Sequence, residues 1–517
     1  MALLGNLIAR SLKLRKQFTL PTAAPRTYQR HVLRHLLDRG QYTLFGKHYG
    51  FDEILETEVD FIKAFQERVP PHDYDKMHAE WWHLAQESVE NVSWPGKVKY
   101  FALSSGTSGS ASKHIPVTGD MIRTVKNMGF KQLYSMVNFK VPASAFGKGI
   151  LMLGGTTSLL ERGEYYEGDM SGISVKNMPR WASSLIYKPG QKISKTPQWE
   201  ERIRMIVRRA RQWDVGTVCG VPAWVQLVFE EIIRHHKVKT IHDIWPNLAV
   251  YIHGGVSFEP YREHFQKLLG KQVIFIETYM ASEGSFGFQA RPGGGIKLVL
   301  NNSIFFEFVP FTGENFDDDG NIIGNPQTFL VDEVQEDVDY AVMLTTPSGA
   351  WRYLIGDVVR FTSAKEYEIA IVGRTRQFLS IAGEHMSVEN MNEAIARAQS
   401  KLGVTIREFT VSGSREGDTF AHCWSVGCDD GCATAAELKN IIDATLREIN
   451  DDYAVARDSA LRGMHVNVYP NDVFYDYLKS IGKHGGMSKF PRVLKGSQLA
   501  GWEGYLEMAG VKASSAV

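Results

Sequence analysis

The most constraining feature of the sequence is the alternation of strand-like and helix-like segments between residues 145 and 280. β-rich apolar runs ("AFGKGILMLGG", "LAVYIHGG" and "VIFIETYM") alternate with stretches whose apolar residues recur at helical spacing, such as "WVQLVFEEIIRHH" after Pro222. Strands separated by helices in this way form a parallel sheet that is covered on both faces. The sequence therefore predicts an α/β architecture for this part of the chain.

The segments on either side of this region have other patterns. Residues 1–95 are expected to be mostly helical, because Leu33, Leu36 and Leu37 recur at helical spacing. The runs "SIFFEFVP", "TFLVDEV" and "YAVMLTT" follow one another closely, as strands do in an antiparallel or barrel-like subdomain. We expect mixed sheets with helical cover to be joined to such a subdomain.

The last part of the chain predicts a separate small unit. The strand-like runs "EFTVSGS", "AHCWSVG" and "HVNVYP" surround a long helical stretch, "TAAELKNIIDATLREIN", which is an α+β pattern. A chain of 517 residues is too long for one hydrophobic core. We therefore expect a large N-terminal domain, residues 1–376, and a small C-terminal domain, residues 377–517.

The composition excludes several classes of partner. Lys plus Arg and Asp plus Glu both number 58, so the basic excess typical of nucleic-acid-binding proteins is missing. No apolar run approaches the roughly 18 residues that a membrane span needs. Four cysteines in the whole chain indicate a reducing compartment rather than a disulfide scaffold. We expect a cytoplasmic monomer that acts on small molecules, with no nucleic-acid or membrane partner.

A loop rich in glycine and hydroxyl side chains, "SSGTSGSASKHIP" at residues 104–116, follows the strand-like run "YFALSS". Backbone N–H groups in such a loop can converge on an anion, hydroxyls add donors, and Lys113 adds a positive charge. The spacing of Gly106, Gly109 and Lys113 does not fit the P-loop pattern. A phosphate-binding loop of another kind is favoured over a flexible linker, because linkers rarely lie between a strand and an amphipathic helix.

Three further motifs contain candidate binding residues. "ETYMASEG" follows a strand, where α/β folds bind ligands, so Tyr279 would stack on a planar base and Glu283 would hold Mg²⁺. A buried tyrosine and a solvated glutamate would show the same pattern. "WRYLIGDVVRF" places Asp357 on an expected tight turn, suited to ribose hydroxyls, with Arg352 as a possible core ion-pair partner. "HGGVSFEP" offers Gly254 and Gly255 for close approach of a flat ring.

In this order and spacing, "SSGTSGSASKHIP", "HGGVSFEPY", "TYMASEG", "WRYLIGDVV" and "GRTRQFLS" resemble the adenylate-forming enzyme superfamily. Within it the sequence is similar to the Gretchen Hagen family of auxin-responsive acyl acid amido synthetases, especially the bacterial type. The resemblance covers nearly the whole chain. It implies a large adenylation domain with a small mobile C-terminal domain. It also implies that ATP and Mg²⁺ activate a carboxylic acid as acyl-AMP, which an amino acid amine then attacks.

The resemblance also implies roles for individual residues. Matching positions place the phosphates against Ser104, Ser105, Thr107 and Ser108, with Lys113 nearby, and Mg²⁺ against Thr107 and Glu283. Tyr279 and Gly255 would contact adenine, Asp357 would bind the ribose, and Arg374 would mark the hinge before the small domain. In "GGMSKFPRVLK", Lys489 matches a lysine that reaches the α-phosphate, although Met487 replaces the usual glutamine.

The acyl acid itself is less defined by the sequence. Trp224, Val225, Val228, Gly254 and Val256 are expected to line a partly aromatic, apolar pocket. Arg162 and Arg180 are candidates for holding a carboxylate and equally for surface salt bridges. Two other interpretations stay open: an acyl-CoA ligase that shares the adenylation step, and a nucleotide- or acid-binding protein without catalysis.

Overall fold

The structure is a computed structural model, and every structural statement below refers to the residues that it describes. These are residues 24–57, 60–104, 113–255, 258–317, 320–375, 379, 381, 384, 386–416, 419–429, 434–458, 461–483, 490–511 and 514–516. Among the predicted site residues, Ser105, Thr107, Ser108, Val256 and Lys489 lie outside this part of the chain.

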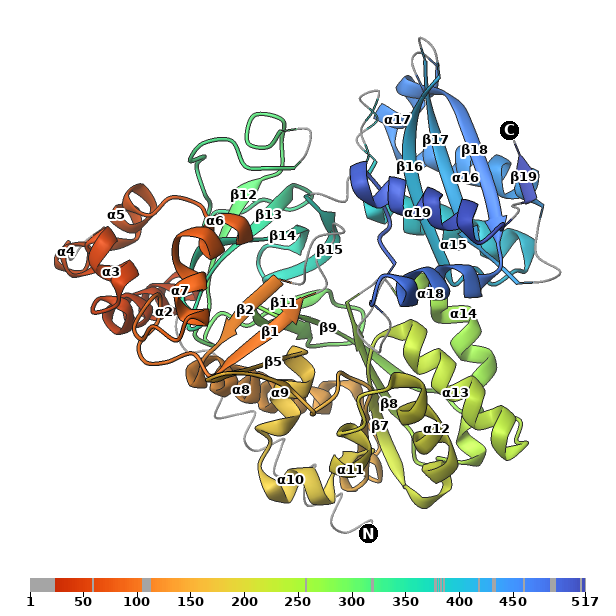
Figure 1. Cartoon of the computed structure of the whole chain (residues 1–517), viewed down its shortest axis with the longest axis horizontal. Helices are drawn as coiled ribbons and strands as arrows, with labels where there is room; N and C mark the ends of the chain where they lie inside the picture. Colours follow the sequence, from red (N-terminus) through yellow and green to blue (C-terminus); the bar gives the residue numbers. More distant parts are fainter. Residues whose placement is uncertain are drawn as a thin grey trace.

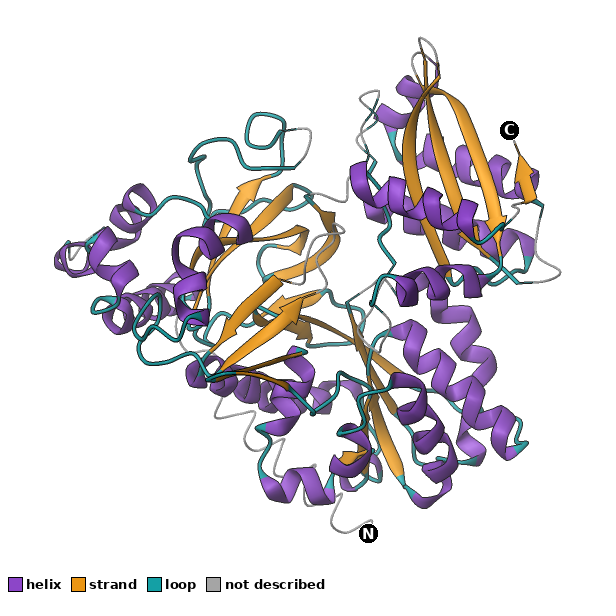
Figure 2. Ribbon diagram, viewed as in Figure 1, coloured by secondary structure: helices purple, strands orange, loops and turns teal. Residues whose placement is uncertain are grey.

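An eleven-stranded mixed sheet forms the centre of the large N-terminal part (Figures 1 and 2). Its strands, in spatial order, are β12 (Phe305–Pro310), β13 (Asp339–Thr346), β14 (Ala350–Ser363), β15 (Glu368–Arg374), β11 (Ile296–Leu298), β10 (Gly284–Gln289), β9 (Ile274–Ala281), β8 (Val250–Gly254), β7 (Val215–Cys219), β3 (Gly149–Met152) and β6 (Tyr187–Lys188). Neighbours from β6 to β9 are parallel, which confirms the prediction from the alternating segments. From β9 to β12 they are antiparallel, so the expected antiparallel strands continue the same sheet.

Helices cover this sheet with their apolar faces. On the parallel half these are α12 (Trp199–Arg209), α13 (Pro222–His236) and α14 (Glu259–Leu268), which enclose a core that includes Trp245 and Phe265. α8 (Gly119–Ser135), capped at its N-terminus by Thr118, packs on β10. The helices of the predicted helical N-terminal region are α2 (Pro25–Gly40), α3 (Leu44–Tyr49), α4 (Phe51–Glu56), α5 (Phe61–Arg68), α6 (Tyr74–Met77) and α7 (His83–Gln86), with a π-helical segment, His78–Trp82, between the last two.

A second, small sheet lies beside the first, and two of its strands flank the Gly/Ser-rich loop. Its order is β2 (Lys113–Val117), β1 (Tyr100–Ser104), β5 (Tyr165–Gly168) and β4 (Leu160–Arg162). β1 and β2 are antiparallel neighbours, and Ser104 lies opposite Lys113. The two ends of the loop are therefore held next to each other by a strand pair.

The C-terminal unit has a sheet of its own. Its strands are β16 (Glu408–Glu416), β17 (Thr419–Gly427), β18 (Leu461–Tyr469) and β19 (Ser514–Ala516), and its helices are α15 (Val388–Leu402), α16 (Ala435–Ile449), α17 (Asp451–Asp458), α18 (Asn471–Ser480) and α19 (Gly496–Met508). Figure 1 shows this unit in blue, next to α14. Arg407 of the unit pairs with Glu230 of α13, with an Nη2–Oε1 distance of 3.2 Å. The boundary at residues 376 and 377, which are not described, stays a prediction.

Two sequence-based expectations differ from the structure. "TFLVDEV" forms no strand beyond a single bridge at Phe329; it is apolar because Leu330, Val331 and Val334 pack into the core. Cys219 and Cys423 are free thiols, but Cys428 is in a disulfide. The low cysteine count argues only against a scaffold of many disulfides, so it could not predict this single bond.

No helix among the described residues is long and apolar enough to cross a membrane.

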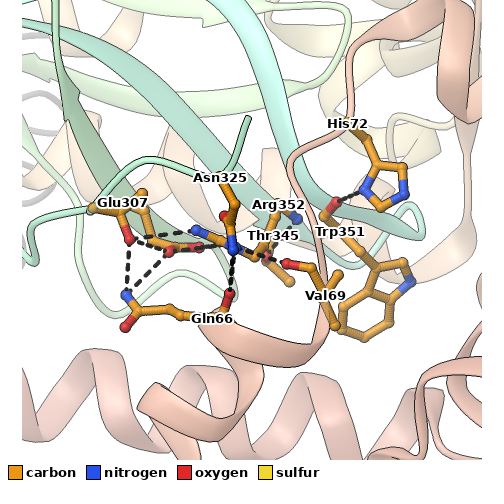
Figure 3. A network of polar contacts seen from close by, with 9 residues as sticks. Gln66, Val69, His72, Glu307, Asn325, Thr345, Trp351 and Arg352 are labelled. Atoms are coloured by element: carbon orange, nitrogen blue, oxygen red, sulfur yellow. Dashed lines mark hydrogen bonds and ion pairs between the residues drawn. The ribbon is translucent and has the colours of Figure 1, made fainter. Parts of the chain in front are cut away.

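A closed polar network joins α5 to β12 and β14 (Figure 3). The Arg352 side chain pairs with Glu307, with an Nε–Oε1 distance of 3.2 Å, and each side chain is only 1% exposed. Arg352 Nη1 also donates to the carbonyl oxygens of Gln66 and Val69, at 2.7 Å each, and to Asn325 Oδ1 at 3.1 Å. The expected core ion pair of Arg352 is thus confirmed, and it holds the helical N-terminal region on the sheet.

Candidate active site

A cleft with a volume of about 2740 Å³ brings most of the described candidate residues for nucleotide binding together. Six of the predicted nucleotide-binding residues line it: Lys113, Gly255, Tyr279, Glu283, Asp357 and Arg374. Residues of the C-terminal unit, including Arg492 and Leu494, line it as well. The last residues of β7, β8 and β9, which are Cys219, Gly254 and Ala281, line the cleft, and the carboxyl ends of strands are where α/β folds bind ligands.

Asp357 lies at the centre of a hydrogen-bonded group in the cleft. Its Oδ2 accepts from the Tyr279 hydroxyl at 2.8 Å, and its Oδ1 accepts from Arg374 Nε at 2.9 Å. The second bond crosses from β14 to β15, because Asp357 and Arg374 are register partners. The carboxylate is therefore fixed from two sides and still has lone pairs for a ligand.

The expected tight turn at Asp357 is wrong, because β14 runs through this position as one strand. The strand is irregular instead: Gly356 has φ +85°, which side-chain-bearing residues rarely adopt. An added Cβ there would meet only Thr375 Oγ1, at 3.8 Å. Glycine is required at position 356 for its backbone conformation and not for space, and this conformation aims the next residue, Asp357, into the cleft.

The charged groups of this site shift one another's protonation. Burial raises the pKa of the Tyr279 hydroxyl well above its usual value, and Asp357 raises it further, so the hydroxyl stays a donor. For Arg374, burial lowers the pKa, but the carboxylates of Asp357 and Glu283 outweigh it and the net pKa is raised. Arg374 is therefore a permanent positive charge at the cleft.

Glu283 is buried although it lies in the two-residue hairpin loop between β9 and β10. It is 7% exposed, and its Oε1 accepts from the Tyr353 hydroxyl at 3.4 Å. Burial raises the pKa of its carboxyl, against the lowering effects of Arg374 and Lys113. A cation at this carboxylate would reverse the effect of burial, and carboxylate oxygen is a ligand that Mg²⁺ prefers.

No cluster of three or more acidic, His or Cys side chains suitable for a metal occurs within the described residues. Glu283 is the one described residue predicted to bind metal. This donor set fits Mg²⁺, which is bound by one or two carboxylates together with substrate phosphates, more closely than a metal held by protein ligands alone.

Lys113 lies at the start of β2, at one end of the Gly/Ser-rich loop. Its ammonium group is 5.1 Å from the ring centre of Tyr74. The Tyr74 hydroxyl in turn accepts from the backbone N–H of His114 at 2.9 Å. These contacts hold the Lys113 charge at the wall of the cleft, near enough to Glu283 to lower the pKa of that carboxyl.

Profiles of a single family match most of the chain. The GH3 family N-terminal domain matches residues 14–210 and 162–274, its central domain 297–374 and its C-terminal domain 389–498. The chain belongs to the GH3 family. This confirms the resemblance found from the motifs.

The indole-3-acetic acid-amido synthetase GH3.2 of Arabidopsis thaliana is 22% identical to this GH3 chain over 467 residues, covering 75% of this chain and 82% of the relative. Among solved structures, a GH3.15 acyl acid amido synthetase has a TM-score of 0.75 at 16% identity, covering 98% of this chain and 97% of that one. A 2-hydroxyisobutyryl-CoA ligase in the postadenylation state has a TM-score of 0.60 at 13% identity, covering 95% and 93%. Both structural likenesses confirm the predicted fold class.

Three residues predicted to line the acyl pocket do not lie along the cleft of this GH3 chain. Trp224, Val225 and Val228 are at most 4% exposed and belong to the core beneath α13. The apolar face of an amphipathic helix looks the same in sequence whether it meets a core or a ligand, so the pattern could not separate the two. Gly254 does line the cleft, and for Ser104 only the backbone, at the end of β1, is described.

Neither of the two arginines that the sequence suggested for the acyl acid lines the cleft. Arg162 is exposed and pairs with Glu167, and Arg180 is exposed as well. Arg202 of α12, which sequence analysis missed, lines the cleft and is 6% exposed. Its position was a usable signal, because it lies three residues after Trp199 and four before Ile206, on the buried face of the helix.

Proposed function

We propose that this GH3 chain is an ATP-dependent acyl acid amido synthetase, a ligase that forms carbon–nitrogen bonds. In the first half-reaction, a carboxylate oxygen of the acid bonds to the α-phosphorus of ATP, and the bond to pyrophosphate breaks. In the second, the nitrogen of an amino acid bonds to the acyl carbon, the bond to AMP breaks, and the nitrogen loses a proton. The acid is activated because AMP is a far better leaving group than oxide.

The convergence of the six predicted residues on one cleft, in a chain with all three GH3 domains, is the observation that carries this proposal. In the proposed reaction Asp357, fixed by Tyr279 and Arg374, accepts hydrogen bonds from the ribose hydroxyls. Tyr279 and Gly255 border the adenine. Arg374 and Lys113 offset the negative charge that builds up when a carboxylate approaches a phosphate.

Glu283 would hold Mg²⁺, which supplies charge neutralisation for the phosphates when bound. Thr107 as a second ligand, Ser104, Ser105 and Ser108 at the phosphates, and Lys489 at the α-phosphate stay predictions. The predicted movement of the C-terminal domain between the two half-reactions stays one too. That unit already contributes residues to the cleft, which supports a role for it in the chemistry.

Product analysis tests the proposal. The purified protein is incubated with ATP, Mg²⁺, a panel of carboxylic acids and a mixture of amino acids, and amides and AMP are measured by mass spectrometry. An amide formed together with AMP supports the proposal. A parallel reaction replaces the amino acids with coenzyme A. A thioester formed there, with no amide in the first reaction, would assign the chain to acyl-CoA ligases instead.

A further inference from the structure

Arg202 is a buried cation with donors that the protein does not satisfy. Its Nη1 donates to the Gly154 carbonyl oxygen at 3.1 Å, and its guanidinium stands 4.9 Å from the ring centre of Trp199. Its Nε has no hydrogen-bond partner. The carboxylate of Asp169 is near enough to raise the pKa of the guanidinium, but burial outweighs this effect and the net pKa is lowered. Since Arg202 is only 6% exposed, water solvates it poorly.

A second unsatisfied donor lies beside it. Trp199 Nε1 is buried without a hydrogen-bond partner, and Trp199 also lines the cleft. Buried donors are normally paired, and the cost of leaving one unpaired is highest for a charged group. Two side chains on one turn of α12 thus line the same cleft, and each has a donor without an acceptor among the described residues.

Their position relative to the nucleotide-binding residues fits the far end of the acyl substrate. Gly154, which accepts from Arg202, follows β3, and Tyr279 is on β9; β7 and β8 lie between these strands. Three spacings of about 4.8 Å place the two positions roughly 14 Å apart along the sheet edge. The cleft is continuous between them, past Gly220 and Gly254.

We propose that this subsite binds an oxygen acceptor on the acyl acid, remote from the carboxylate that reacts. This inference rests on the proposed function, because it assigns the substrate class of the same cleft: hydroxy-, oxo- or dicarboxylic acids in preference to unsubstituted ones. Arg202 and Trp199 donate to that oxygen. A site with such donors discriminates strongly against a ligand that lacks the oxygen, since binding it leaves both donors unpaired.

The charge of Asp169 predicts which oxygen groups of the acyl acid the subsite prefers. It precedes α9 (Met170–Lys176), lines the cleft, and its charge acts on Arg202. Its carboxylate would accept a hydrogen bond from a substrate hydroxyl and would repel a second carboxylate. Asp169→Asn should therefore tighten the binding of dicarboxylic acids and should leave that of hydroxy acids unchanged or weaker.

Calorimetry on the full chain, with a non-hydrolysable ATP analogue present, tests the inference without requiring catalysis. The probes are 3-phenylpropanoic acid with its 4-hydroxy and 4-carboxy derivatives, and octanoic acid with its 8-hydroxy and 8-carboxy derivatives. In at least one series, the wild-type protein should bind an oxygenated member about tenfold or more tightly than the parent acid. Arg202→Met should remove this preference. Arg204→Met, which changes an exposed residue of the same helix, should keep it.

Two outcomes would overturn the inference: no preference for an oxygenated acid in either series, or a preference that survives in Arg202→Met. Arg202→Gln is measured alongside, so that a folding defect of the Met variant does not decide the result. Failure of the proposed function would look different. An oxygenated acid would then bind with the predicted dependence on Arg202, but no pyrophosphate exchange would follow with ATP and Mg²⁺.

Discussion

Among the arginine–carboxylate pairs on β14, those of Arg352 and Asp357 have sharply different surroundings. Near its start, Arg352 and Glu307 are each 1% exposed, and protein acceptors surround the guanidinium (Figure 3). Five residues later Asp357 pairs with Arg374, but these side chains are 13% and 38% exposed and face the cleft. The first network is closed and the second is open on one side. An arginine–carboxylate pair alone therefore does not show whether it stabilises the fold or binds a ligand. The partners of its remaining donors and acceptors decide between these roles.

The largest effect is expected for Glu283→Gln, which changes a residue of the cleft that the open Asp357–Arg374 pair faces. Glutamine keeps an acceptor for the Tyr353 hydroxyl but lacks the negative charge that would hold Mg²⁺. Adenylation should fall on the order of 10³-fold, as for loss of one main electrostatic contact. The melting temperature should stay close to that of the wild type. Turnover equal to the wild type in a steady-state assay would remove Glu283 from the chemistry.

Arg352→Met removes the cation of the closed network. It leaves the Glu307 carboxylate buried without a cation, which should lower the free energy of unfolding of the N-terminal part by about 3–5 kcal/mol. Urea unfolding monitored by tryptophan fluorescence measures this. Arg234→Met, which removes an exposed pair with Glu231, is the control and should change stability by less than about 1 kcal/mol. Equal effects of the two variants would contradict the claim that the closed pair stabilises the fold more than an exposed pair does.

Asp357→Asn tests the open pair with Arg374 in the cleft. The amide oxygen can still accept from Tyr279, but the ion pair with Arg374 and the charge-assisted bonds to a ribose are lost. We expect kcat/KM for ATP to fall about 50-fold, in line with hydrogen bonds to a charged group. The KM for the acyl acid should change little. An effect confined to the acid would mean that Asp357 does not contact the nucleotide.

The raised pKa of Glu283 predicts a pH dependence of Mg²⁺ binding. Burial shifts this pKa upward from the ordinary value of 4.5, and Mg²⁺ binds only the deprotonated form. As pH falls below the raised pKa, the apparent affinity for Mg²⁺ with ATP should drop about tenfold per pH unit, and above it the affinity should level off. Titration of activity with Mg²⁺ at several pH values measures this. The same dependence in Glu283→Gln would assign it to another group.

The smallest effect is expected for Tyr279→Phe, which removes one hydrogen bond from Asp357 and keeps the ring against Phe286. The KM for ATP should rise about fivefold, corresponding to one net hydrogen bond. The value of kcat should change less. A loss as large as that of Asp357→Asn would show that the hydroxyl does more than orient the carboxylate.

The sequence predicted some residues that line the cleft better than the contacts between them. Tyr279, Glu283 and Asp357 line the cleft, and they follow or interrupt strand-like runs, where α/β folds place ligands. The pairing of Asp357 with Arg374 depends on strand register, which a single sequence does not reveal. Glycine marks both turns and irregular strand positions in sequence, so the pattern at Gly356 predicts a turn where the structure has an irregular strand.

The end of the cleft near Arg202 was predicted least well. Trp224, Val225 and Val228 have the pattern of an apolar helix face, and only tertiary packing shows that this face meets the core. Arg202 was missed because the charge of an arginine suggests exposure, although its spacing from Trp199 and Ile206 places it on the buried face. Burial of a polar group is set by tertiary structure, so local pattern alone rarely finds it.

The most direct test of the central claim, that this cleft adenylates carboxylic acids, is exchange of labelled pyrophosphate into ATP over a panel of acids. The wild-type protein should catalyse exchange that depends on both an acid and Mg²⁺, and Glu283→Gln should lose it. If the protein binds ATP but no acid in a broad panel supports exchange, the claim is contradicted. The cleft would then be a binding site without the proposed chemistry.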